Sequence, residues 1–206
     1  RDSYYLYMIV DIYSRCIVGW EVYEEETGEC ARELITRAYI RQALWRKDRP
    51  LVLHSDNGSP MKASTFRATL ERLGITDSYS RPRTSDDNAY SESLFRTLKY
   101  RPEYPVSGFE SLQAAREWTH RFVHWYNEIH RHSALKYVTP GQRHRGESAG
   151  ILASRKEVFE KAKRGHPERW KGHPIRNLEE ATVVWLNPEK DGKVRETLTR
   201  EKRHVG

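Results

Sequence analysis

The order of strand and helix patterns along the chain predicts a mixed α/β sheet covered by helices. Residues 4–13 are mostly apolar and rich in aromatic and β-branched side chains, and residues 16–23 alternate, so the two segments predict an antiparallel hairpin. A short apolar strand is then expected at residues 51–55 and an edge strand at residues 75–80, with amphipathic helices between and after them. Two antiparallel strands followed by strand–helix alternation predict one mixed sheet flanked by helices.

Several local signals mark where the helices begin and end. Thr27 is placed to cap a helix whose apolar positions are three or four residues apart. A further helix is expected from residue 63 or 64, and Gly74 suits the position just after its end. Residues 109–135 predict one long helix. Its core-facing stripe consists of Trp118, Phe122, Trp125 and Ile129.

The last part of the chain is expected to be a basic extension of a core that spans residues 1–145. Residues 146–206 contain an amphipathic basic helix pattern at 154–164 and a strand pattern at 181–186. The formal net charge is +7, and residues 151–206 hold 14 Lys and Arg against 9 Asp and Glu. This excess indicates a polyanionic partner, although a solubilising surface explains it equally well. No membrane partner is expected, because no apolar run approaches the roughly 20 residues of a membrane helix.

Asp56 and Glu92 are the candidate catalytic and metal-binding residues. Asp56 follows the expected strand at 51–55, Glu92 lies in an expected helix, and 35 residues separate them. A carboxylate at a strand end and another on a helix can converge on Mg²⁺ or Mn²⁺, which take hard oxygen ligands. Two such ions about 4 Å apart activate a nucleophile and stabilise the leaving oxygen in phosphodiester cleavage.

Two basic residues follow Glu92 on the same helix face. Arg96 and Lys99 lie four and seven residues after Glu92, where they are placed to hold a DNA phosphate beside the metal. Structural interpretations stay open for both carboxylates. Asp56 also fits an Asp-Asn-Gly turn, and Glu92 also fits a surface ion pair with Arg96.

His54 and Asn88 are further candidates for contact with DNA. His54 precedes Asp56 by two positions and therefore points to the same face of the strand, but a partly buried, hydrogen-bonded histidine is equally expected. Asn88 either caps the helix of Glu92, which we favour, or contacts the substrate.

These motifs resemble the integrase catalytic core of retroviral integrases and bacterial insertion-sequence transposases, and most closely the second-reading-frame transposases. The resemblance spans about residues 4–145. It is carried by Tyr5-Leu6-Tyr7, Tyr13-Ser14-Arg15, Ile17-Val18-Gly19-Trp20, His54-Ser55-Asp56-Asn57-Gly58, Asp87-Asn88-Ala89, Glu92-Ser93, Leu98-Lys99, Tyr126-Asn127, Arg131-His132-Ser133 and Thr139-Pro140.

The resemblance implies a ribonuclease-H-like fold and a DDE-type enzyme. Such an enzyme cuts DNA at transposon ends and joins the freed 3′-hydroxyl to target DNA, using Mg²⁺ or Mn²⁺, with two ions in the complete site. Homo-oligomers on DNA and a location in the bacterial cytoplasm are implied as well. The resemblance carries the second and third catalytic carboxylates onto Asp56 and Glu92.

The resemblance also implies that the first catalytic aspartate lies outside this chain. In the family, that residue belongs to a strand before the one that matches Tyr5-Leu6-Tyr7, and Asp11 matches a noncatalytic aspartate of the hairpin. The chain begins at Arg1, so we expect it to lack this central strand, to expose sheet edges and to be inactive alone. Alternatives are a noncatalytic DNA-binding or assembly fragment, a ribonuclease-H-like nuclease that cuts without joining, and a basic α/β protein without a metal site.

Overall fold

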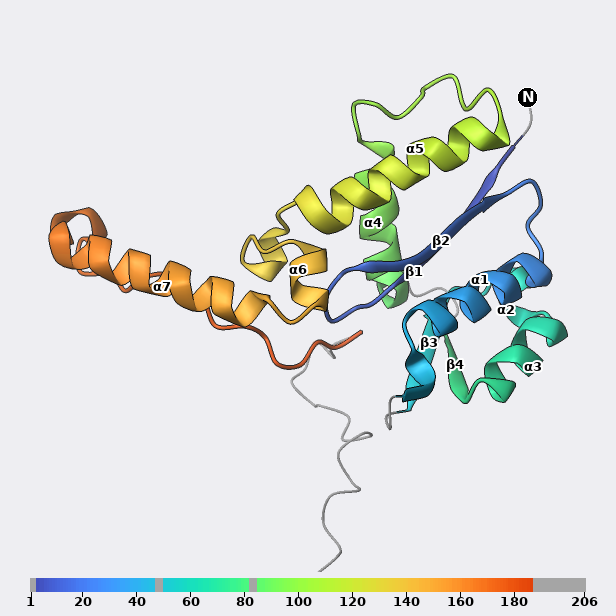
Figure 1. Cartoon of the computed structure of the whole chain (residues 1–206), viewed down its shortest axis with the longest axis horizontal. Helices are drawn as coiled ribbons and strands as arrows, with labels where there is room; N and C mark the ends of the chain where they lie inside the picture. The colour runs from blue at the N-terminus through green and yellow to red at the C-terminus, as the bar shows by residue number, and fades with distance from the viewer. Residues whose placement is uncertain (1–2, 47–49, 82–84, 187–206) are drawn as a thin grey trace, which may run out of the picture.

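The computed structural model describes residues 3–46, 50–81 and 85–186, and it begins with the expected hairpin (Figure 1). β1 (Tyr5–Val10) and β2 (Ile17–Tyr23) pair antiparallel, with Tyr5 opposite Tyr23. Asp11 holds the turn between them, because its carboxylate accepts a hydrogen bond of 3.1 Å from the backbone N–H of Ser14. The hairpin prediction is therefore confirmed.

Helix α1 (Gly28–Arg41) packs on one side of the hairpin. The hydroxyl oxygen of Thr27 accepts a hydrogen bond of 3.3 Å from the backbone N–H of Cys30, so the predicted cap is confirmed. The contact between helix and hairpin is close: a Cβ atom on Gly19 would lie 3.1 Å from the Cβ of Ala38. Glycine at this position of β2 therefore allows α1 to approach the hairpin.

A second unit consists of two parallel strands joined by helices. β3 (Leu51–Ser55) and β4 (Ile75–Tyr79) are connected through α2 (Ser59–Lys62) and α3 (Ser64–Arg72). Gly74 follows α3 with a φ of +67°, as expected for the residue after a helix end. This unit packs against α1 through a core of Ala31, Ile35, Phe66, Leu70 and Ile75.

The mixed α/β composition is confirmed, but the strands do not form one continuous sheet. Within the described residues, β1 pairs with β2, β3 pairs with β4, and no strand pairing joins the two sheets. A cavity of about 400 Å³ is lined by residues of both β1 and β3 and lies between the two strands. Among the described residues, β3 is therefore paired along one edge only, with β4.

Helices α4 (Ala89–Lys99) and α5 (Leu112–His124) pack against the other side of the hairpin (Figure 1). The core between them contains Ile17, Leu94, Leu98, Trp118, Phe122, Val123 and Tyr126. The stripe predicted for α5 is confirmed at Trp118 and Phe122, which are buried, but it is wrong at Ile129, which is 57% exposed.

The predicted long helix over residues 109–135 is interrupted by a π-helix, η3 (Trp125–Ile129). Its wider turn is closed by a 2.8 Å hydrogen bond from the backbone N–H of His130 to the carbonyl of Trp125. One extra residue in the turn changes the direction of the side chains that follow, and this moves Ile129 out of the core. Short 3₁₀ turns lie at Leu44–Arg46, Ser85–Asn88, Ser133–Leu135 and Pro167–Trp170.

The C-terminal part begins with α6 (Pro140–His144) and continues into α7 (Ser148–Gly165), which projects away from the rest of the molecule (Figure 1). The helix predicted at 154–164 is confirmed and is longer than expected. Residues 171–186 return along α7, and Leu178 is buried against Leu135, Val138 and Leu152.

The strand predicted at residues 181–186 is wrong. Its carbonyl groups bond to side chains instead of a neighbouring strand: Ala181 accepts from the guanidinium of Arg143 at 2.9 Å, and Trp185 accepts from the hydroxyl of Tyr90 at 2.8 Å. The rest of the predicted extension, residues 187–206, lies outside the described residues. Among the described helices, none combines the length and the apolar character that crossing a membrane requires.

Candidate active site

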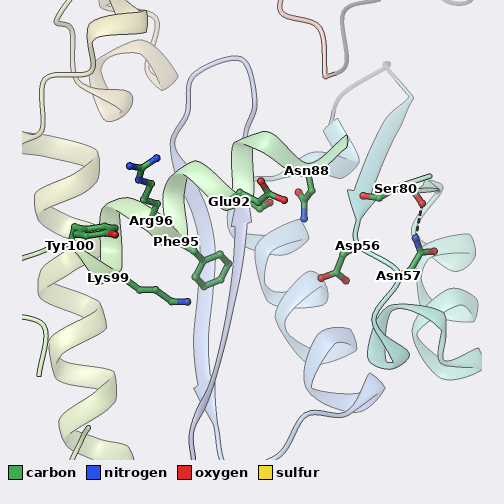
Figure 2. Close-up of a pocket in the computed structure, with 10 residues that line it drawn as sticks. Asp56, Asn57, Ser80, Asn88, Glu92, Phe95, Arg96, Lys99 and Tyr100 are labelled. Atoms are coloured by element: carbon green, nitrogen blue, oxygen red, sulfur yellow. Dashed lines mark hydrogen bonds between the residues drawn. The ribbon is translucent and has the colours of Figure 1, made fainter. Parts of the chain in front are cut away.

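Asp56 and Glu92 line one open cavity of about 710 Å³, where the end of β3 faces α4 (Figure 2). Asn88, Arg96 and Lys99 line the same cavity, so the structure brings five of the six candidate residues together. Figure 2 shows the side chains of Asp56, Asn88 and Glu92 facing a common space, with Phe95 and Lys99 further along α4. The spacing along the helix places Glu92, Arg96 and Lys99 on one face, as the sequence predicts.

Asp56 belongs to a turn and also faces the cavity. Its Oδ1 atom accepts a hydrogen bond of 3.0 Å from the backbone N–H of Gly58. The next residue, Asn57, donates from its amide to the carbonyl of Ser80 at 2.6 Å, which fastens the turn to the segment after β4. The turn interpretation and the metal-binding interpretation therefore do not compete, because the turn fixes the direction of the carboxylate.

Glu92 does not form the surface ion pair that was its alternative interpretation. Among the described residues, neither Glu92 nor Asp56 takes part in a salt bridge, and the guanidinium carbon of Arg96 lies 5.8 Å from the ring centroid of Tyr100. In the described part of the chain both carboxylates are thus without an ion pair, so their oxygen atoms are available to a cation.

Asn88 occupies the N-cap position of α4, but its side chain makes no capping hydrogen bond. The favoured interpretation of this side chain as a cap is therefore wrong. Its amide faces the cavity next to Glu92 instead (Figure 2), which agrees with the alternative of substrate contact.

His54 lies outside the cavity of Asp56 and Glu92 and uses both ring nitrogens within the protein. Nδ1 lies 3.0 Å from the hydroxyl of Ser78, and Nε2 lies 3.2 Å from the hydroxyl of Ser80. This geometry agrees with the partly buried, hydrogen-bonded histidine that was the alternative to DNA contact.

Asp87 is a residue whose importance the sequence pattern did not reveal. It is only 2% exposed and accepts three hydrogen bonds from Arg81, from the backbone N–H at 2.7 Å, from Nε at 2.9 Å and from Nη2 at 2.8 Å. These bonds hold the pKa of Asp87 at about 2, well below its usual value. Asp87 thereby fixes the segment that leads into α4 and positions Asn88 and Glu92. The sequence offered one signal for this contact: Asp87 is an acidic residue just before a predicted helix, and Arg81 precedes it by six positions.

Asp11 is not part of this site. It bonds to Ser14 and lies 3.4 Å from the ring nitrogen Nδ1 of His144, on the turn of the hairpin. Burial alone would raise the pKa of Asp11, but the hydrogen bonds from His144 and Ser14 outweigh this effect and lower the pKa to about 2. These contacts match the noncatalytic role expected for this residue.

The side chains that line the cavity offer some, but not all, of the oxygen ligands that a hard divalent cation needs. Two carboxylates and a neighbouring amide offer the oxygen ligands that Mg²⁺ and Mn²⁺ prefer. In the described part of the chain, however, no three His, Cys, Asp or Glu side chains come together in a cluster that could hold a metal ion. A complete site of two ions therefore needs at least one further ligand.

The sequence of the chain matches one family in two overlapping segments. Residues 1–85 and residues 73–140 both match sequence profiles described as integrase core domain. A transposase for insertion sequence element IS904 from Lactococcus lactis subsp. lactis (strain IL1403) is 31% identical over 141 residues, which cover 68% of this chain and 54% of that transposase. Transposase InsF for insertion sequence IS3A from Escherichia coli (strain K12) is 29% identical over 141 residues, with 67% and 47% covered. The chain thus spans about half the length of these transposases.

Two solved structures share the fold. The catalytic core domain of BIV integrase superposes with a TM-score of 0.51 at 21% sequence identity, covering 71% of this chain and 88% of that domain. A chain in the structure of the simian T-cell lymphotropic virus intasome in complex with PP2A regulatory subunit B56 gamma gives a TM-score of 0.50 at 17% identity, covering 68% of this chain and 47% of that chain. These similarities establish the ribonuclease-H-like, integrase-type fold.

Proposed function

Because this chain belongs to the integrase core family of insertion-sequence transposases, we propose that the cavity at Asp56 and Glu92 is part of an active site for DNA transposition. The reaction is cleavage of phosphodiester bonds at transposon ends, followed by attack of the freed 3′-hydroxyl on target DNA. The observation that carries the proposal is that two carboxylates, which form no ion pair with any described residue, lie in the same cavity as Arg96 and Lys99.

Each residue of the cavity has a distinct role in this proposal. Asp56 and Glu92 hold the metal, in a complete site that contains two ions. When bound, Mg²⁺ or Mn²⁺ supplies activation of the attacking hydroxyl and stabilisation of the leaving oxygen. Arg96 and Lys99 bind phosphates of the same strand next to the reacting one, further along α4, and Asn88 orients the reacting phosphate by hydrogen bonding. His54 acts indirectly, because its bonds to Ser78 and Ser80 fix the end of β4.

We further propose that the cavity between β1 and β3 receives one more strand, which carries the first catalytic aspartate. Residues Tyr4–Ile9 and Leu53–Asp56 are consecutive lining residues of this cavity. Since consecutive side chains of a strand point to opposite faces, the cavity meets both strands at their edges, where backbone N–H and C=O groups are available for pairing. Asp56, Asn88 and Ser91 line the cavity too, so a carboxylate on an inserted strand can reach the metal-binding residues. Without that strand we expect the chain to be inactive.

The inserted strand is testable by extending the chain at its N-terminus with the segment that precedes Arg1 in the gene. Hydrogen exchange at the amides of β1 and β3 should slow, because pairing protects edge amides. A matched control carries a proline in the middle of the added segment, which cannot complete the pairing. Equal exchange in the extended chain and in the control, together with unchanged stability, would contradict the proposal.

The reaction is testable with the longer protein, using DNA that ends in the terminal sequence of its own element. Asp56→Asn and Glu92→Gln should each abolish both strand cleavage and strand transfer in Mg²⁺, and each should weaken Mn²⁺ binding measured by calorimetry. Glu71→Gln, an exposed carboxylate on α3, is the matched control and should leave both unchanged. Strand transfer that survives either substitution would falsify the assignment.

The same experiments separate the alternatives. A nuclease with this fold cuts the DNA but produces no joined strand-transfer product. A noncatalytic DNA-binding or assembly fragment binds DNA in the extended form but neither cuts nor joins it. Assembly as a homo-oligomer on paired DNA ends, and action in the bacterial cytoplasm, are parts of the proposal that rest on the resemblance to the integrase core family.

A further inference from the structure

Tyr100 is an exposed aromatic residue of the candidate site that the proposed reaction leaves without a role. Its side chain lines the cavity of Asp56 and Glu92, yet the residue is 77% exposed. It follows α4 directly, and its backbone N–H donates to the carbonyl of Arg96 at 3.1 Å, so its backbone is fixed by the helix. Figure 2 shows its ring at the far end of the cavity from Asp56, next to Arg96 and Lys99.

The surroundings of this ring match a nucleic-acid base better than a phosphate. The neutral phenol ring offers an apolar face, whereas Arg96 and Lys99 supply the positive charges for the DNA backbone. An aromatic ring beside cations in one groove is the arrangement with which proteins bind single-stranded nucleic acid, the cations following the backbone and the ring stacking on a base. The guanidinium of Arg96, 5.8 Å from the ring centroid of Tyr100, supports the orientation of the ring.

The helix sets the distance between this ring and the reacting phosphate. Tyr100 is the C-cap of α4, eight residues after Glu92. It lies about 12 Å along the helix axis from Glu92 at about 1.5 Å per residue, and about 80° around the axis at 3.6 residues per turn. Successive nucleotides of one strand advance about 3.4 Å along a duplex and more in an extended strand. The ring is therefore about two to four nucleotides away from a phosphate held at Glu92.

We propose that Tyr100 stacks on an unpaired base of the DNA end, two to four nucleotides from the phosphodiester at Asp56 and Glu92. This inference rests on the proposed function and adds a residue that positions the substrate strand. Bases inside a duplex are covered by their neighbours, so stacking on Tyr100 requires the end of the DNA to be open at this point. The tyrosine then holds one strand in the groove after the end has opened.

A fluorescent base tests this contact directly. Duplexes with the terminal sequence of the element carry 2-aminopurine at each of the last six positions in turn, and the full-length protein is added in EDTA so that no cleavage occurs. Quenching should be greatest at one of the positions two to four from the reacting phosphate. Tyr100→Ala should remove this quenching and weaken binding to an open end about 10-fold, whereas Tyr100→Phe should keep both.

Tyr137→Ala is the control for loss of an exposed tyrosine, since Tyr137 is 49% exposed and lines neither the cavity of Asp56 and Glu92 nor the cavity between β1 and β3. Unchanged quenching in Tyr100→Ala overturns the proposal. The proposal is also overturned if Tyr100→Ala changes the oligomeric state of the protein but not the quenching, because Tyr100 then contacts another protein subunit and not a base. Quenching does not require catalysis, so it separates failure of this inference from failure of the proposed reaction, which Glu92→Gln tests.

Discussion

Asn127 lies in η3, directly after α5, and joins this segment to the hairpin. Its replacement by alanine should destabilise the protein strongly. Its Oδ1 atom accepts a hydrogen bond of 3.0 Å from the backbone N–H of Ile17, and its Nδ2 atom donates to the carbonyl of the same residue at 3.0 Å. Ile17 is 4% exposed and lies at the start of β2. The amide of Asn127 therefore satisfies both backbone groups of a buried residue.

The size of the effect follows from what Asn127→Ala leaves behind. A buried polar group without a partner costs about 1–3 kcal/mol, and two such groups remain at Ile17. Asn127 is half-buried, so water replaces part of the loss, and we expect the lower part of the summed range, about 2–4 kcal/mol. For a protein of this size, each kcal/mol lowers Tm by about 2–4 °C, which gives a decrease of about 5–15 °C.

Urea denaturation followed by circular dichroism measures this change, with Tm from a thermal scan as the second measurement. Asn177→Ala is the matched control, because Asn177 is exposed and its side chain accepts only a local hydrogen bond from the backbone N–H of Glu179. The control should change the free energy of unfolding by less than about 0.5 kcal/mol. If Asn127→Ala and Asn177→Ala destabilise the protein equally, the two hydrogen bonds between η3 and the hairpin do not stabilise the fold as argued.

Three further predictions concern charge and packing. Lys99→Gln should reduce the slope of log K against log salt concentration for DNA binding by about 0.9, the loss of one phosphate contact, and Arg72→Gln on the exposed end of α3 should leave the slope unchanged. The pKa of Asp11 is about 2 in the folded protein, against an ordinary value of 3.8. The ionised carboxylate therefore stabilises the fold above pH 4, and this stabilisation is lost between about pH 4 and pH 2. Tm measured across this pH window should fall less in Asp11→Asn than in the wild type. Gly141→Ala should lower the free energy of unfolding, measured by urea denaturation, by about 1–3 kcal/mol because the added Cβ would lie 2.8 Å from the carbonyl of Asn127. Gly150→Ala should instead stabilise α7 by about 0.5–1 kcal/mol, because a Cβ at this position meets no described atom within 4 Å.

Features that depend on neighbouring residues were predictable from the sequence. Thr27 caps α1 and Gly74 follows α3 because the chemistry of a helix end involves only a few adjacent positions. The hairpin was predictable for the same reason, since its two strands and its turn are contiguous. The placement of Glu92, Arg96 and Lys99 on one helix face follows from helix geometry alone.

Features that depend on distant residues were not predictable in this way. The apolar pattern of α5 continues to Ile129, but Asn127 bonds to a residue 110 positions earlier, and the chain forms a π-helix there instead of a regular turn. The pattern at 181–186 is typical of a strand, yet Arg143 and Tyr90 occupy carbonyls that a neighbouring strand would need. The strand patterns predicted one mixed sheet, and no local pattern indicated that β1 and β3 would belong to two separate sheets in the described part of the chain.

The two candidate metal ligands are positioned through one shared segment, residues 80–81. Asn57, next to Asp56, donates to the carbonyl of Ser80 at 2.6 Å, and Asp87, shortly before Glu92, accepts from the backbone N–H of Arg81 at 2.7 Å. The turn that carries Asp56 and the helix that carries Glu92 are therefore both fastened to the end of β4.

This arrangement explains why Asp56 and Glu92 face one another although, within the described residues, no strand pairing joins the sheets of β1 and β3. An inserted strand would then add a third carboxylate to a pair that is already oriented, and the ligands would lose less conformational freedom on binding metal. Residues 80–81 and Asp87 contribute to this orientation without touching the metal. Weakening the anchor should therefore lower metal affinity while both carboxylates remain in place.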